Sequence, residues 1–267
     1  MFALITSGVL ALSLVLVTVL KYKFIAKKKC LLGRHVIVTG GSSGIGKCIA
    51  LEAAKIGANV TIVARNENRL RSALEEIKGQ CSYNDQKFNY LSVDLAGDYN
   101  MVKTTLNNAI DEMGPLCLFI NCAGMAICGT LEDISSNDIM TKNFGIKVTL
   151  ALPPDTDTPG YANESKDKPL ETLLISETAN LFTPEEVGRQ ILQDTLDGRF
   201  FSTVGFEGHM MTISCAGMAP YTSYLELICQ VFCAGILRLI TVYYQSTFDK
   251  IIKKCKLDRE HLKNNKT

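Results

Sequence analysis

The residues best suited to chemistry in this chain form a glycine-rich loop. Residues 39–46 read TGGSSGIG, with Gly40, Gly44 and Gly46 in a G-x-x-x-G-x-G pattern. A short apolar run, residues 35–39, predicts a buried strand before the loop, and residues 47–56 predict a helix after it. Glycines in that context permit a tight turn and a close backbone approach, and the helix N-terminus offers free N–H groups to phosphate. The loop therefore predicts a nucleotide-binding site, to which the hydroxyls of Ser42 and Ser43 can add donors.

The end of the second predicted strand, residues 60–64, indicates which nucleotide is bound. An NAD-specific site places an acidic residue there for the ribose 2′-hydroxyl. This strand is followed instead by Arg65, with Arg69 one helical turn further on. Two guanidinium groups in that arrangement can hold a 2′-phosphate, which favours NADPH as the cofactor. The alternative is that both arginines belong to the solvated first turn of a helix.

Two further residues follow later strands of the same predicted sheet. Asp94 ends a strand predicted over residues 90–95, where its carboxylate could accept a hydrogen bond from the adenine amino group or serve only as a turn residue. Asn121 begins the motif NCAG, residues 121–124, and can hold the sheet edge near the ribose.

The interval after NCAG is too short for a complete nucleotide-dependent reductase. The motif PPDTDTPG begins at Pro153, so only residues 125–152 separate the two motifs. Two more helices and two more strands with short loops need about 40 residues or more. The chain therefore has the cofactor side of an enzyme and a shortfall of chain where the remaining structure should lie.

Apolar periodicity along the chain alternates between strand and helix patterns, which predicts a doubly wound parallel α/β sheet. Asn66, Asp98 and Thr183 are the expected helix N-caps, Thr183 as part of a capping box with proline at the first helical position. Further strands are expected over residues 116–121, 146–152 and 200–204, and a short helix over residues 137–142. The predicted organisation is an N-terminal membrane segment with its basic flank (1–29), a nucleotide-binding domain with an internal deletion near 141–145 (30–208) and a membrane-associated C-terminal region (209–267).

Composition excludes several classes of function. The 267 residues carry a net charge of +1 and no basic stripe interleaved with aromatic residues, so a nucleic-acid partner is not expected. The three histidines have no metal-site spacing, and the ten cysteines include no C-x-x-C pair, which favours reduced core thiols.

Both ends of the chain are strongly apolar. Residues 2–20 form an uncharged apolar run followed by lysines, which favours a membrane anchor with the main domain in the cytosol over a cleaved signal peptide. Residues 213–244 are a second apolar region, interrupted by Pro220, Glu226 and Arg238. It predicts an interfacial helix or hairpin, with packing onto the domain as core as the alternative. The basic tail, residues 250–267, fits a membrane surface.

Taken together, TGGSSGIG, the Val93-Asp94 pair, NCAG and a Pro-Gly after the penultimate strand resemble the short-chain dehydrogenase/reductase family. The stretches VARNE, PPDTDTPG, KPLET, LISET and CAGMAP are similar to its 3-ketodihydrosphingosine reductase branch. The resemblance implies NADPH-dependent reduction of a long-chain keto-sphingoid substrate at the cytosolic face of the endoplasmic reticulum. It also implies this set of cofactor contacts: Gly40, Ser42, Ser43, Gly44, Ile45, Gly46, Arg65, Arg69, Asp94 and Asn121.

The catalytic residues of the family are not found where they should be. The family uses a tyrosine that protonates the carbonyl, a lysine four residues later that lowers the tyrosine's pKa, and a serine. Residues 125–152 contain no Tyr-x-x-x-Lys. Tyr83 and Lys87 have the right spacing but precede the third strand, at the wrong end of the sheet. Ser135 and Ser136 fit helix caps better than the missing serine, and Asn143 could support a catalytic lysine or lead into a strand.

Three hypotheses follow from this pattern. The chain is a reductase shortened by splicing or by a missing exon in its gene model, a membrane-attached pseudoenzyme that binds NADPH, or an unstable fragment. A single contiguous segment is missing between two well-preserved motifs. This favours the first hypothesis, a shortened reductase, and predicts that the chain does not turn over substrate. Because the missing segment includes about one strand and two helices, one of them a helix commonly used for dimerisation, oligomerisation is expected to be impaired.

Overall fold

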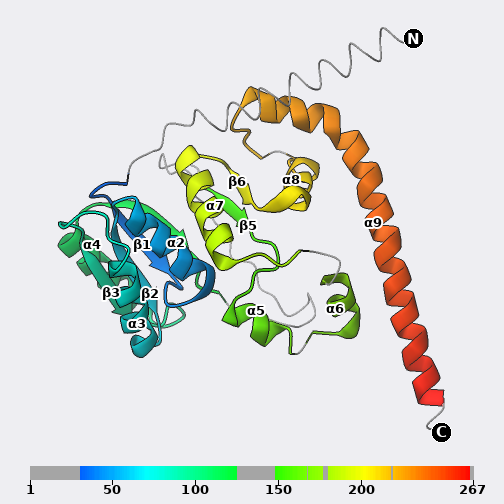
Figure 1. Cartoon of the computed structure of the whole chain (residues 1–267), viewed down its shortest axis with the longest axis horizontal. Helices are drawn as coiled ribbons and strands as arrows, with labels where there is room; N and C mark the ends of the chain where they lie inside the picture. The colour runs from blue at the N-terminus through cyan, green and yellow to red at the C-terminus, as the bar shows by residue number, and fades with distance from the viewer. Residues whose placement is uncertain (1–30, 125–147, 167, 177–179, 218, 265–267) are drawn as a thin grey trace.

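The computed structural model describes residues 31–124, 148–166, 168–176, 180–217 and 219–264 (Figure 1). The N-terminal apolar run, the helix expected over residues 137–142, Asn143 and the junction near 141–145 lie outside these ranges. Ser135 and Ser136 lie outside them as well.

The nucleotide-binding half is a four-stranded parallel sheet in the order β3-β2-β1-β4. The apolar strands predicted from the sequence are present, and the sheet has the crossover connections of a doubly wound fold. The strands are β1 (His35–Thr39), β2 (Asn59–Ala64), β3 (Phe88–Ser92) and β4 (Leu116–Asn121).

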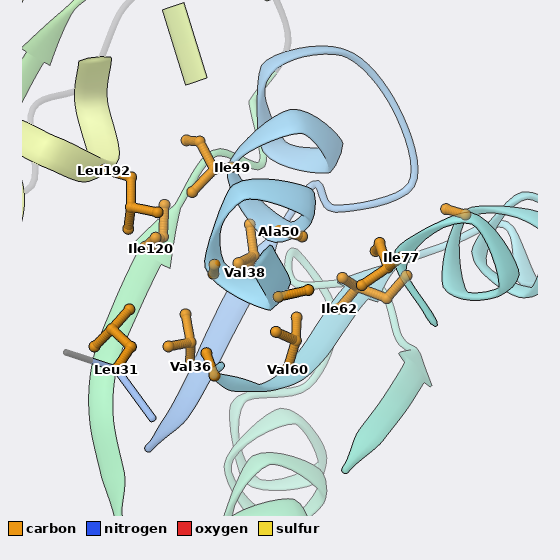
Figure 2. Close-up of a cluster of buried hydrophobic side chains, with 14 of the residues drawn as sticks. Leu31, Val36, Val38, Ile49, Ala50, Val60, Ile62, Ile77, Ile120 and Leu192 are labelled. Carbon is orange, nitrogen blue, oxygen red and sulfur yellow. The ribbon is translucent and has the colours of Figure 1, made fainter. Parts of the chain in front are cut away.

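Helices cover both faces of this sheet. Residues of α2 (Gly44–Lys55), α3 (Glu67–Lys78) and α7 (Pro184–Asp197) share one core with the strands, while α4 (Tyr99–Met113) covers the other face. Figure 2 shows Val36, Val38, Val60 and Ile62 of the strands beneath Ile49 of α2. Complete burial of these branched side chains supplies the main stabilisation of the fold, at about 1.5–3 kcal/mol for each side chain.

The helix caps predicted from the sequence are confirmed. The side chain of Asn66 accepts a hydrogen bond from the Arg69 amide, Asp98 accepts one from the Met101 amide, and Thr183 accepts one from the Glu186 amide. The last of these helices ends at Gly198, whose φ of 74° is the left-handed conformation typical of a C-terminal glycine.

A second parallel sheet contains only β5 (Leu150–Leu152) and β6 (Phe201–Thr203). In the described residues no hydrogen-bonded ladder joins β4 to β5, so each presents an unpaired edge, as expected for a sheet that lacks a central strand. On the face of the two sheets that α7 covers, the apolar core continues from β4 to β5, because Ala151 of β5 packs against the cluster that contains Ile120 of β4. On the opposite face the side chains of β4 and β5 are exposed to solvent: Phe119 is 45% exposed and Leu150 is 48% exposed.

Three predicted boundaries are wrong. The first helix begins at Gly44 inside the glycine loop, and not at residue 47. The third strand covers Phe88–Ser92 instead of 90–95. The Val93 amide still donates to the Ala64 carbonyl at 3.0 Å, and the side chains of Val93 and Leu95 pack against α4 beyond the last paired residue. Of the strand predicted over 146–152, residues 146 and 147 are not described and only Leu150–Leu152 are paired.

The C-terminal region is a continuous helix and not a hairpin. The short helices α5 (Pro159–Glu164), α6 (Leu170–Ser176) and α8 (Gly205–Ser214) precede α9 (Tyr224–Asn264), which is 41 residues long. Pro220 lies before α9, and neither Glu226 nor Arg238 interrupts it. Among the described helices, α9 is long and apolar enough to cross a membrane, over Glu226–Leu257 with a mean hydropathy of 1.7.

A buried histidine makes the stability of the sheet depend on pH. The Nδ1 and Nε2 atoms of His35 lie 3.0 Å from the Gly114 carbonyl and 2.9 Å from the Thr61 hydroxyl. Burial lowers the pKa of His35 below its ordinary 6.5, and the hydrogen bond to Gly114 offsets only part of that shift. Because the unfolded chain takes up the proton more readily, the free energy of unfolding is expected to fall as pH drops below about 6.5.

This expectation is tested by urea unfolding of wild type and His35→Gln between about pH 7.5 and pH 5. The wild type should lose more stability over that interval than the variant. Identical pH profiles for wild type and His35→Gln would contradict the role of His35.

Candidate functional site

The glycine loop joins the carboxyl end of β1 to the N-terminus of α2. Gly40 and Gly44 have φ angles of +67° and +56°, which favour glycine because a Cβ atom is strained there. The Gly40 amide donates to the Val63 carbonyl at 2.8 Å, so the backbone leaves the sheet at this residue.

Two close backbone approaches exclude a Cβ atom at Gly40 and at Gly46. A Cβ atom on Gly40 would lie 2.7 Å from the Cys122 carbonyl oxygen, and one on Gly46 would lie 2.6 Å from the Gly40 carbonyl oxygen. Since both obstacles are backbone atoms, neither can move aside at low cost. The loop is therefore held against NCAG and beneath the first turn of α2.

The N-terminus of α2 is open to an anion. Ser43 is its N-cap residue, with an extended backbone, but its side chain accepts no hydrogen bond from the helix and the first turn holds no acidic residue. By contrast, side chains cap α3, α4, α5 and α7. Free N–H groups at the positive end of a helix fit a pyrophosphate, with Ser42, Ser43 and the backbone of Ile45 half-buried beside them.

Thr39 organises the site, although no local sequence pattern singles out its side chain. Its hydroxyl donates to Asn121 Oδ1 at 2.9 Å and accepts from the amides of Cys122 and Ala123 at 3.1 and 3.0 Å. One hydroxyl therefore fixes the NCAG turn against the end of β1. The contact joins residues more than eighty positions apart, so local patterns could not reveal it.

The two predicted phosphate-binding arginines are exposed at the end of β2. Within the described part of the chain neither guanidinium forms an ion pair, whereas nearby Arg71 pairs with Glu67 at 2.7 Å. Arg65 directly follows β2, and Arg69 lies in the first turn of α3. Both positive charges are available for a ligand at the same edge of the sheet as the glycine loop.

Asp94 and Asn121, both predicted to contact the cofactor, form hydrogen bonds within the protein. Asp94 lies two residues beyond β3, where its Oδ1 accepts from the Ala96 amide at 3.1 Å. The turn interpretation of Asp94 is therefore confirmed, and its other carboxylate oxygen stays available for adenine. Asn121 Oδ1 is occupied by Thr39, so its amide NH₂ is the group left for the ribose.

In the folded chain the PPDTDTPG motif lies beside the glycine loop. A Cβ atom on Gly44 would lie 3.3 Å from Thr158 Cγ2, which shows how closely the two segments approach. Thr158 is the N-cap of α5 and accepts from the Tyr161 amide at 3.1 Å. Thr158 is a second site residue that the sequence-based prediction did not include.

The cysteines near the site are protonated thiols. Burial raises the pKa of Cys122 in NCAG to about 11. The pKa of Cys48 in α2 rises to about 12, first through burial and then through the neighbouring Glu185 carboxylate. Neither thiol is a nucleophile near neutral pH, because nucleophilicity requires the thiolate.

No Tyr-x-x-x-Lys sequence lies at the glycine loop among the described residues. Tyr161, three residues after Thr158, has Lys168 Nζ 4.5 Å from its ring centroid, but these two residues are seven positions apart. Tyr83 and Lys87 precede β3, at the opposite edge of the parallel sheet from the glycine loop. Tyr99 and Lys103 form a second Tyr-x-x-x-Lys pattern that the sequence-based prediction overlooked. The Lys103 Nζ atom lies 6.0 Å from the Tyr99 ring centroid, and Tyr99 is 72% exposed.

The second pair borders a shallow cavity of about 260 Å³ between α4 and β4. Apolar side chains make up most of its lining, and neither the glycine loop nor Asn121 takes part. Because Lys103 approaches the face of the ring, this contact is a surface cation–π arrangement. Tyr99 therefore lies outside the glycine-loop site and is not placed to act as the proton donor to a substrate reduced by a cofactor bound there.

Comparisons with known proteins agree with this geometry. The family model for short chain dehydrogenases matches residues 34–152. The chain is 35% identical to a bovine 3-ketodihydrosphingosine reductase, over 88% of this chain and 90% of the relative. It is 34% identical to the zebrafish 3-dehydrosphinganine reductase over 86% and 89%, and 27% identical to an Arabidopsis 3-dehydrosphinganine reductase over 83% and 86%.

The bovine alignment extends over more positions than this chain can occupy. It spans 300 positions, whereas 88% of the 267 residues is about 235, so about 65 positions oppose a gap in this chain. The relative thus contains sequence that has no counterpart here.

Solved structures support the fold. A short chain dehydrogenase from Bacillus anthracis superposes with a TM-score of 0.50 at 19% identity, over 67% of this chain and 98% of that one. A reductase/Diels-Alderase from Malbranchea aurantiaca gives a TM-score of 0.50 at 17% identity, over 65% and 94%. The Rossmann-like sheet, the glycine loop and the two near-full-length relatives together show that this chain belongs to the short-chain dehydrogenase/reductase family, with the 3-ketodihydrosphingosine reductases among its relatives.

Proposed function

We propose that this chain is a membrane-attached member of the 3-ketodihydrosphingosine reductase lineage that binds NADPH but does not reduce substrate as it stands. One observation carries the binding half of the proposal. The N-terminus of α2 has no side-chain cap within the described residues, and the loop before it has no room for a Cβ atom at Gly40 or Gly46. At the same sheet edge lie the guanidinium groups of Arg65 and Arg69, which form no ion pair within that part of the chain.

The reaction of the lineage is reduction of the keto group of 3-ketosphinganine, a long-chain keto-sphingoid base. When bound, NADPH supplies the hydride for that reaction. The backbone of the glycine loop would hold its pyrophosphate, Arg65 and Arg69 its 2′-phosphate, and Asp94 its adenine. Asn121, held by Thr39, would face the ribose.

The lack of turnover follows from a missing proton donor. A tyrosine with an ordinary pKa near 10 is a poor acid at neutral pH without a neighbouring cation. No Tyr-x-x-x-Lys occurs between NCAG and PPDTDTPG. Within the described residues β4 and β5 are not paired with each other, and about 65 positions of the bovine alignment have no residue in this chain. Both observations support loss of the whole segment that carries this pair.

The proposed location is the endoplasmic reticulum membrane, with the nucleotide-binding domain facing the cytosol. The apolar run over residues 2–20 and the lysines after it support this orientation. The apolar surface of α9 supports contact with membrane lipid. We further propose that loss of the missing helices impairs oligomerisation.

Arg65→Ala/Arg69→Ala tests the cofactor assignment. Removing two charge-assisted contacts worth about 2 kcal/mol together should weaken NADPH binding about 30-fold. NADH, which has no 2′-phosphate, should bind with nearly unchanged affinity. Dissociation constants come from the fluorescence of the reduced nicotinamide.

Arg71→Ala is the matched control, since Arg71 already pairs with Glu67 on the same helix. It should leave both dissociation constants unchanged. Equal losses for NADPH and NADH in the double variant would refute the 2′-phosphate role. A cooperatively folded wild type that binds neither dinucleotide would overturn the proposed function.

A further inference from the structure

The helix α9 has one face on the protein and another in solvent. It packs against α8 and α6 on the side of the molecule away from the β1–β4 sheet (Figure 1). Leu237 and Cys255 of α9 are only 8% and 4% exposed. These two residues are separated by about 27 Å at 1.5 Å rise per residue, so α9 contacts the rest of the protein at two separate places, although only 6% of its apolar segment is buried.

The outer face of α9 carries a continuous apolar stripe, and Ile236, Tyr244 and Ile252 add exposed apolar surface beside it and on the Leu237 side of the helix. The members of the stripe recur every three or four residues, and most are more than half exposed, up to 76% for Phe232. We call this surface the α9 stripe; it consists of Ile228, Val231, Phe232, Leu239, Val242 and Tyr243. At about 100° per residue these side chains gather on the side opposite Leu237.

Charge is arranged around the stripe and not within it. Arg238 is the one charged residue from 227 to 248, and the helical period places it on the flank of the stripe. Beyond the stripe, Lys250 and Lys253 continue the same outward face and are exposed. An apolar stripe that ends in lysines matches the boundary between lipid chains and anionic headgroups.

The contacts of α9 decide between two ways of meeting a bilayer. A helix that crosses a membrane exposes its whole middle to hydrocarbon, so α6 and α8 would have to enter the bilayer with it. Those helices carry polar side chains such as Glu171 and Glu207, whose burial in lipid is costly. A helix that lies in the membrane plane needs only its outer face to meet lipid.

We propose that α9 lies in the plane of an anionic lipid surface, with the α9 stripe at the acyl-chain boundary and Lys250 and Lys253 at the headgroups. The inner face stays on α6 and α8. This inference rests on the proposed membrane attachment and specifies its geometry.

The chain contains no tryptophan, so a single introduced tryptophan reports its own depth. Four full-length variants place it on the outer face: Ile228→Trp, Phe232→Trp, Leu239→Trp and Tyr243→Trp. Gln230→Trp, on the inner side of the same helix, is the matched control. Each is reconstituted into phosphatidylcholine–phosphatidylserine vesicles whose acyl chains carry bromine at either a shallow or a deep position.

The in-plane geometry predicts that all four outer tryptophans are quenched several-fold more by shallow than by deep bromine, and to a similar extent. The Gln230→Trp control should be quenched weakly by both. A spanning helix would instead make Leu239→Trp the deepest site, with Ile228→Trp much shallower, and that pattern would overturn the inference.

Two further outcomes separate this inference from the proposed function. If the protein floats with the vesicles but no outer tryptophan is quenched, α9 does not touch lipid and only the inference fails. If the protein does not float at all, the membrane attachment fails as well. NADPH binding, measured on the same samples, reports the cofactor assignment independently.

Discussion

A chimera that receives the segment between NCAG and PPDTDTPG from the bovine relative is expected to reduce 3-ketosphinganine at least about 10³-fold faster than the natural chain. General acid–base catalysis alone contributes about 10²–10⁴-fold, and correct placement of the substrate adds to it. In the short-chain dehydrogenase/reductase family that segment holds the tyrosine, its activating lysine and the serine. Turnover is measured as loss of nicotinamide absorbance together with sphinganine formed.

The structure gives a physical reason to expect the chimera to fold. The edges of β4 and β5 are both parallel strand edges, and the core on the α7 side already continues from one to the other. A strand inserted between them would satisfy unpaired backbone groups on both sides. Helices from the same segment would cover Phe119 and Leu150. The chimera should therefore also unfold at a higher denaturant concentration.

The control is the same chimera with the tyrosine of the grafted Tyr-x-x-x-Lys changed to phenylalanine. It should fold and bind NADPH as the chimera does, yet return to the baseline rate of the natural chain. A chimera that folds, binds NADPH and stays inactive would contradict the assignment of the defect to the missing segment.

Gly46→Ala is expected to weaken NADPH binding about 100-fold. The added Cβ atom would lie 2.6 Å from the Gly40 carbonyl oxygen, so the first turn of α2 must move away from the loop. That shift displaces the N–H groups that hold the pyrophosphate. Strain of this kind costs about 1–3 kcal/mol, and a change of 2.8 kcal/mol is about 100-fold in a dissociation constant.

Gly124→Ala is the matched control, because a Cβ atom at Gly124 meets none of the described atoms beyond its neighbours within 4 Å. It should keep wild-type affinity for NADPH. Circular dichroism and urea unfolding establish that Gly46→Ala remains folded. A folded Gly46→Ala protein with unchanged affinity would refute the placement of the pyrophosphate at this loop.

Local signals allowed most of the nucleotide-binding half to be predicted. Asn66, Asp98 and Thr183 cap the helices they were expected to cap, since capping depends on residues only three positions away. The end of the third strand was misplaced because the alternating apolar residues Leu91, Val93 and Leu95 all pack on the α4 side, and this pattern continues past the last paired residue, Ser92. A hydrophobic pattern indicates which side chains are buried, and a side chain can be buried without its backbone being paired in a sheet.

Longer-range features could not be predicted in the same way. The hydrogen bonds of Thr39 to the NCAG segment and the approach of Thr158 to Gly44 depend on how distant strands meet. The extent of α9 was missed because Glu226 and Arg238 suggested interruptions, whereas exposed charged residues are compatible with a continuous helix. The loss of a central strand was predicted from a length argument, and the separation of β5 from β4 agrees with it.

The central claim is that this chain binds NADPH without turning over substrate. The most direct test is a single-turnover assay with purified full-length protein in excess over NADPH, to which 3-ketosphinganine is added. We predict enhanced nicotinamide fluorescence on binding, followed by no loss of nicotinamide absorbance and no sphinganine. Stoichiometric loss of that absorbance with matching sphinganine would contradict the account.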